Sequence, residues 1–150
     1  MNPRIKAGWS RIGKQNKILT SGFNQRKNFF ISLFLCRKKS FFKTYKKRRR
    51  KEFISYLSAL LFFARGKGAK KIILWVDWAP AHRGLPVRNF CKKHPELKLK
   101  FLPKKAPDLN PVEGRINRPL KSDICSNWYY ETIDDVIRNG RKYLRRWRYY

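Results

Sequence analysis

Two apolar runs of strand length, separated by one amphipathic helix, constrain the fold of this chain most. Residues 28–36 (NFFISLFLC) and 71–77 (KIILWVD) are nearly continuous β-favouring segments, as expected of strands covered on both faces of a sheet. Between them, apolar residues recur at helical spacing over 49–64, and Gly66 and Gly68 end the pattern. The order strand, helix, strand predicts an α/β fold with 28–36 as a central strand.

The remaining segments continue this alternation. A short helix is predicted over 85–93 and a half-exposed strand over 97–102, where apolar and basic residues alternate. Asn110 can cap a helix whose first residue is Pro111. A last helix is predicted over 131–150, with acids early and basic residues late, and Gly140 weakens its middle. Residues 1–27 are rich in Gly, Asn, Lys and Ser and predict loop or hairpin.

The charge of the chain is extreme. Its 38 Lys and Arg residues face only 9 Asp and Glu residues, which gives a net charge of +29 on 150 residues. Self-repulsion at this density opposes compaction unless a polyanion is near, so nucleic acid is the expected partner. The candidate contacts to a phosphate backbone are basic residues in two clusters: Lys46, Lys47, Arg48, Arg49, Arg50, Lys51, and Lys104 with Lys105. The alternative interpretation of the first cluster is a solvated helix start.

Several classes of site are excluded by spacing. Cys36, Cys91 and Cys125 form no CxxC pair and are odd in number, which excludes a zinc ribbon and a disulfide framework and indicates a reducing compartment. The apolar stretches fall short of the roughly 20 residues that cross a bilayer, so no membrane partner is expected. Gly66 and Gly68 lie outside a phosphate-loop pattern.

Two acids stand at chemically informative positions. Asp77 ends the second strand, where open α/β sheets place their sites, and Glu113 follows 113 − 77 = 36 positions later in the first turn of a helix. Two such carboxylates can bind the divalent ions that phosphodiester chemistry uses. The alternative interpretation of Asp77 is a strand-end cap. His82 is interpreted as a structural hydrogen-bonding residue, with a role as metal ligand or base as the alternative. An Asx-type turn explains Asp108 without chemistry.

Two sequence blocks carry a resemblance to a known family. VDWAPAHRG at 76–84 and LPKKAPDLNPVEGRINRPLK at 102–121 resemble the hallmark blocks of mariner-like insertion-sequence transposases, and GWSRIGK at 8–14 is similar to the segment before that family's second strand. The resemblance implies a ribonuclease H-like fold with a mixed central sheet flanked by helices. It also implies an Asp, Asp, Glu triad in which Asp77 is second and Glu113 third, both being catalytic ligands of Mg²⁺ (or Mn²⁺).

The first acid of that triad has no counterpart here. Residues 1–51 contain no Asp or Glu, and Glu52 begins a helix rather than ending a strand. The resemblance therefore implies that 1–150 is a single partial catalytic domain without the first strand and the N-terminal helix-turn-helix region. Such a fragment is expected to be inactive alone, to bind DNA without sequence preference, and to reside in the cytoplasm with the nucleoid. An upstream-encoded fragment and a second copy are further expected partners.

Departures from the family pattern leave an alternative open. Trp78 stands where the family has Asn, and Gly114 and Pro119 predict a helix kinked or broken near Arg118. The alternative function is a non-catalytic, basic nucleic-acid-binding protein derived from a transposase.

Overall fold

The computed structural model describes residues 6–14, 17–19, 25–35, 39–104 and 106–147. Cys36, Lys105, Tyr149 and Tyr150 lie outside these residues. The helices and strands follow in the order β1 (Asn28–Phe34), β2 (Lys39–Tyr45), α1 (Arg50–Arg65), β3 (Ile72–Val76), α2 (Leu85–Lys93), β4 (Leu97–Phe101), α3 (Arg118–Cys125) and α4 (Ile133–Arg146). All of the predicted elements form, and β2 is a strand that the sequence pattern did not predict.

The four strands form two separate ladders. β1 pairs antiparallel with β2, with Asn28 opposite Tyr45, and β3 pairs parallel with β4, with Ile72 opposite Leu97. Within the described residues, the second edge of β1 and the second edge of β3 pair with no strand. The predicted α/β class, with helices flanking the strands, is confirmed. The prediction of 28–36 as a central strand is wrong for the described residues, because β1 pairs with a strand on one edge only.

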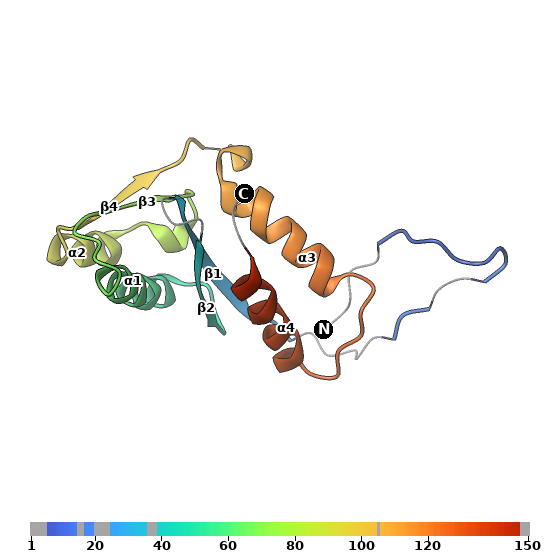
Figure 1. Ribbon diagram of the computed structural model, residues 1–150. Helices are drawn as coiled ribbons and strands as arrows, with labels where there is room; N and C mark the ends of the chain where they lie inside the picture. The colour runs from blue at the N-terminus through green and yellow to red at the C-terminus, as the bar shows by residue number, and fades with distance from the viewer. Residues whose placement is uncertain (1–5, 15–16, 20–24, 36–38, 105, 148–150) are drawn as a thin grey trace.

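Helices cover both faces of β1, as its apolar sequence predicted. Phe30 and Phe34 belong to the buried cluster around α1, whereas Phe29 and Ile31 pack with α3 and α4. Ile72 of β3 belongs to the first cluster too, so α1 packs against both ladders. Figure 1 shows α1 and α2 on one side of β1 and β2, and α3 and α4 on the other side.

α1 buries the predicted apolar stripe, which consists of Phe53, Tyr56, Leu57, Leu60, Leu61 and Ala64. At its start, the Glu52 carboxylate accepts the backbone N–H of Arg49 at 3.2 Å and pairs with the Arg49 guanidinium at 2.7 Å. This contact satisfies one of the backbone donors that a helix start leaves open. In the core, the Tyr56 hydroxyl donates to Ser32 Oγ of β1 at 2.7 Å, and burial raises the pKa of Tyr56.

The helix after Asn110 contains a π-helical turn. Asn110 Oδ1 accepts the backbone N–H of Val112 at 3.1 Å, which confirms the predicted cap. The helical run then continues from residue 111 to Cys125, with the π-helical turn Glu113–Asn117 directly before α3. The helix predicted to be kinked or broken near Arg118 is therefore not broken there, but its irregular turn lies directly before that residue.

Two features accommodate Pro119 in this helix. Proline has no N–H, so it cannot donate to the carbonyl of Arg115 four residues earlier, as an α-helical residue would. The indole N–H of Trp147 donates to that carbonyl at 3.2 Å. In addition, the backbone N–H of Arg118 bonds to Glu113, five residues earlier, which is the π-helical pattern. The irregular turn and the tryptophan thus keep the helix continuous.

α4 packs on the face of β1 opposite to α1. Thr132 caps α4 by accepting the backbone N–H of Asp135 at 3.2 Å, and Gly140 lies where a Cβ would be 3.0 Å from the Phe29 ring.

The N-terminal segment 6–14 is exposed. Its Lys6 exchanges two hydrogen bonds of 2.9 Å with the Asn127 side chain. No helix among the described residues is long and apolar enough to cross a membrane. Both described cysteines, Cys91 and Cys125, are half-buried thiols.

Candidate functional site

Asp77 follows β3 directly, at the carboxyl end of the parallel pair. Its Oδ1 accepts the backbone N–H of Ala79 at 3.0 Å and lies 2.7 Å from Nδ1 of His82. His82 ends the 3₁₀ turn Pro80–His82, and its ring centroid lies 4.4 Å from that of Phe53 in α1. The Asp77 side chain is 55% exposed and that of His82 only 15%. A largely buried histidine therefore orients a carboxylate that faces solvent.

Trp78 connects the ends of β3 and β4. Its indole N–H donates to the carbonyl of Leu102 at 2.6 Å, and the backbone N–H of Leu102 donates back to β3 at 2.9 Å. The Trp78 ring packs on Phe101 with centroids 4.9 Å apart, and Lys104 Nζ lies 5.2 Å from the indole centroid. These contacts fix the start of the loop after β4 beside Asp77.

Glu113 lies at the start of the helix to which this loop leads, as predicted. Its Oε2 accepts the side-chain amide of Asn117 at 2.7 Å, and its Oε1 lies 3.8 Å from Nζ of Lys121. The Glu113 side chain is 35% exposed. Its own helix thus orients this half-exposed carboxylate. Asp108, in the preceding loop, is more exposed and pairs with Arg118 at 3.7 Å.

The carboxylates of Asp77 and Glu113 are the type of ligand that a hard divalent cation binds, but two carboxylates are fewer than a two-metal site uses. Carboxylate oxygens are the ligands that Mg²⁺ prefers, and many sites hold this ion through one or two carboxylates with phosphate oxygens and water. Among the residues described here, no three or more His, Cys, Asp or Glu side chains are grouped closely enough to hold a metal ion. Asp77 and Glu113 are ligands of the right type for such an ion, and a two-metal site would need a further carboxylate.

The predicted DNA-contacting residues lie in two places. Lys46 to Arg49 lead into α1, Arg50 and Lys51 begin it, and all six residues are exposed. Arg50 donates from Nε to the carbonyl of Arg83 at 2.9 Å, which ties the first cluster to the loop that holds Asp77. Lys104 lies over Trp78, and Lys105 is outside the described residues.

Two specific contacts at the carboxyl ends of β3 and β4 were not predicted from the sequence. His82 was interpreted as a structural hydrogen-bonding residue, and the structure gives that bond a specific partner, Asp77. Trp78 was noted only as a departure from the family pattern, yet it holds the ends of β3 and β4 together. The sequence did offer a signal for Trp78, because this residue stands where the family has Asn. It offered none for the partner of His82, which depends on how the turn after β3 folds.

Comparison with known proteins places the chain among its relatives. Residues 1–137 match the DDE superfamily endonuclease family. The "Insertion element IS630 uncharacterized 39 kDa protein" of Shigella sonnei is 26% identical over 144 residues, covering 96% of this chain and 41% of that protein. Two solved structures share the fold at 14% identity: the Mos1 mariner paired-end complex with Mn, with a TM-score of 0.74, and the Mos1 transposase paired-end complex with left transposon end, with a TM-score of 0.73.

The Mos1 matches cover 96% and 95% of this chain, respectively, and 44% of the Mos1 chain in each case. The chain therefore spans less than half the length of the relatives it matches. The family match nevertheless extends over most of its residues, and its fold agrees with that of a mariner transposase. The chain belongs to the DDE superfamily endonucleases.

Proposed function

We propose that this chain contributes Asp77 and Glu113 to a metal-dependent site that cuts DNA and transfers its strands during transposition. The observation that carries the proposal is the orientation of Asp77. His82 and the backbone of Ala79 hold its Oδ1, whereas Oδ2 bonds to no described residue. An exposed, oriented carboxylate oxygen at the end of a parallel pair is suited to bind a cation.

The cation is Mg²⁺ or Mn²⁺, held by Asp77 and Glu113. Bound there, such an ion would polarise a phosphodiester and lower the pKa of an attacking water. The residues of the chain bind and position the substrate: the basic cluster 46–51 and Lys104 contact the phosphate backbone, and His82 keeps the Asp77 carboxylate in one orientation. The support for a divalent ion is the oxygen-only donor set and the family to which the chain belongs.

We propose that a third carboxylate comes from a segment other than 1–150. We infer that it is carried by a strand that inserts between β1 and β3, encoded upstream or supplied by another polypeptide, so that 1–150 is one part of a catalytic domain. Support comes from the free edges of β1 and β3, which both pack on α1. The matching relatives are more than twice as long, which leaves room for this strand and for a separate end-recognition domain.

A nicking assay on supercoiled plasmid DNA tests this proposal. The chain alone with Mg²⁺ or Mn²⁺ is expected to leave the plasmid intact, while a longer version that includes the upstream strand is expected to cut it. Asp77→Asn and Glu113→Gln should each abolish the cutting. Asp123→Asn, which changes an exposed acid of α3, should retain it. Cutting that survives both of the first two substitutions would contradict the proposed roles.

A non-catalytic DNA-binding protein is the second candidate function. It is favoured by the net charge of +29 and by the lack, among the described residues, of any group of three or more His, Cys, Asp or Glu side chains that could hold a metal ion. Under this alternative, salt-sensitive DNA binding is unchanged by Asp77→Ala and Glu113→Ala, and the longer version does not cut DNA in the same assay.

A further inference from the structure

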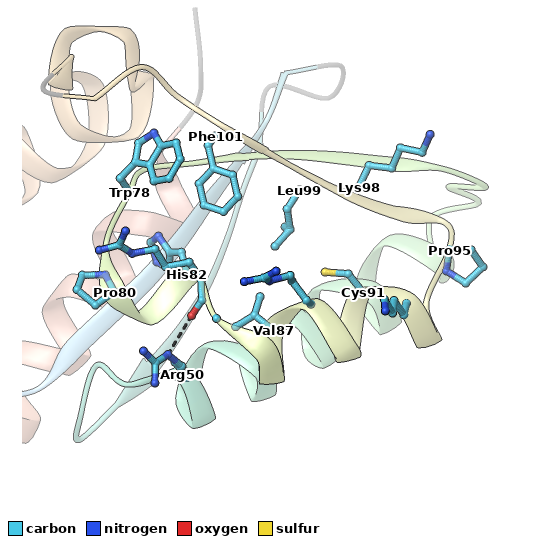
Figure 2. A pocket seen from close by; sticks show the side chains of 14 residues that line it. Arg50, Trp78, Pro80, His82, Val87, Cys91, Pro95, Lys98, Leu99 and Phe101 are labelled. Atoms are coloured by element: carbon cyan, nitrogen blue, oxygen red, sulfur yellow. Dashed lines mark hydrogen bonds between the residues drawn. The ribbon is translucent and has the colours of Figure 1, made fainter.

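A cavity of about 900 Å³ lies between β4 and α2, and Trp78, the residue that follows Asp77, is part of its lining. Neither Asp77 nor Glu113 lines it. In Figure 2, Trp78, Leu99 and Phe101 lie along one wall and Pro80, Val87 and Cys91 along the other. The volume lies within the roughly 300–1,000 Å³ of typical small-molecule sites. We call it the α2–β4 cavity.

The lining of the α2–β4 cavity carries positive charge without compensation. It includes five cationic side chains and no Asp or Glu: Arg50, Arg83, Arg88, Lys92 and Lys98. Arg88 and Lys92 are one turn apart on α2 and therefore lie on one face of the helix. With Lys98, they form no ion pair with any other described residue. The cavity thus combines an apolar, aromatic interior with cations suited to phosphate groups.

We propose that the α2–β4 cavity holds an unpaired base of a DNA strand. The base packs against Trp78 and Phe101, and the flanking phosphates contact Arg88 and Lys92. This inference rests on the proposed function, because Trp78 is the direct neighbour of Asp77 and a strand positioned for cleavage passes the mouth of the cavity. Base stacking on aromatic rings is tolerant of sequence, which agrees with the absence of an acidic or amide reader among the lining residues.

Binding of two labelled single strands tests the proposal without any cleavage. Fluorescence anisotropy in EDTA compares a short oligothymidylate with an abasic strand of equal length and phosphate number. The whole chain is expected to bind the oligothymidylate at least about fivefold more tightly, as one stacked base would provide. Trp78→Leu should remove this preference, whereas Trp128→Leu, at an exposed tryptophan outside the cavity, should retain it.

Trp78→Leu also removes the hydrogen bond to Leu102, so its effect could come from a local change in folding. A second variant distinguishes this effect from the loss of base stacking. Cys91→Trp fills the cavity from the α2 wall and should abolish the preference while leaving the Trp78 bond in place. Arg88→Gln with Lys92→Gln should weaken binding of the oligothymidylate more than Lys142→Gln with Arg146→Gln, which removes the same charge from α4.

The outcomes separate this proposal from the previous one. Equal affinity for both strands, or a preference that persists in Cys91→Trp, would overturn the base-binding role of the cavity and leave the cleavage proposal standing. Failure to bind DNA of any kind would overturn both. A preference that is retained while the longer version cuts no plasmid would overturn only the cleavage proposal.

Discussion

His82 links the hydrophobic core to the candidate metal site through a single side chain. Its ring packs against Phe53 and Phe30, with centroids 4.4 and 6.4 Å away, while Nδ1 lies 2.7 Å from Asp77 Oδ1. Because core packing fixes the ring, the orientation of the carboxylate depends on how α1 and β1 pack. His82 is thus a positioning residue, and its hydrogen-bonding role, predicted from the sequence, is confirmed.

Glu52 makes the stability of α1 depend on pH. The hydrogen bond from Arg49 lowers the pKa of Glu52 from its ordinary 4.5 to about 2. A depressed folded-state pKa contributes stability above the unfolded value and loses that contribution as the pH falls through the folded value. The wild type should therefore have a higher urea midpoint than Glu52→Gln at neutral pH. This difference should shrink between pH 4.5 and pH 2.

The matched control for this prediction is Glu131→Gln. Glu131 is exposed and lies outside α4, so its removal should leave the urea midpoint nearly unchanged at every pH. A difference between the wild type and Glu52→Gln that stays constant down to pH 2 would show that the Arg49–Glu52 contact does not stabilise the helix start.

At the scale of elements, periodicity sufficed for the helices but not for every strand. α2 forms over Leu85–Lys93 as predicted, because its apolar spacing and the proline near its start are local signals. β2 was missed because its sequence, KSFFKTY, mixes basic with aromatic residues and directly precedes the basic cluster, and its identity as a strand depends on pairing with β1. The π-helical turn was missed for a similar reason, since Trp147 reaches Arg115 from 32 positions away.

In the candidate site, too, local features were predicted and long-range contacts were not. The placement of Asp77 at a strand end and of Glu113 in a first helical turn followed from the local pattern, and both placements are confirmed. The contacts around these two acids could not be predicted from the local pattern. The bond from Trp78 to Leu102 joins residues 24 positions apart, and only the parallel register of β3 and β4 brings them together.

Gly140 allows α4 to approach β1 closely. A Cβ at this position would lie 3.0 Å from Cζ of Phe29 and 3.4 Å from its Cε2. Gly140→Ala should therefore destabilise the wild type by about 1 kcal/mol, because overpacking outweighs the gain in helix propensity. In a Phe29→Leu background, the ring is gone and the same substitution should stabilise by up to about 1 kcal/mol. Urea unfolding of the four variants measures this change of sign.

Lys142→Ala provides the control for helix propensity, since Lys142 is exposed on α4. Its effect should be the same in the wild-type and Phe29→Leu backgrounds. If Gly140→Ala is equally stabilising in both backgrounds, the close contact with Phe29 does not explain why a glycine stands in the middle of this helix.

At the scale of the whole molecule, two features favour association with other strands and with polyanions. α1 packs against two ladders, and among the described residues neither ladder pairs with a further strand; such free edges favour association. The charge of +29 opposes compaction. The proposed strand would pair with the free edges, and DNA would neutralise the positive charge. Both are therefore expected to stabilise the fold.

The distribution of charge predicts where duplex DNA binds. Non-specific affinity should fall with salt, and the logarithmic slope should decrease by roughly 0.9 for each phosphate that the protein no longer neutralises. Replacing Lys46, Lys47 and Arg48 by Gln should therefore reduce the slope by up to about 3. The same number of replacements at Lys67, Lys70 and Lys71, which follow the other end of α1, should reduce it less. Equal reductions, measured by anisotropy over a salt series, would mean that DNA binds across the whole basic surface rather than at the end of α1 that lies next to Asp77.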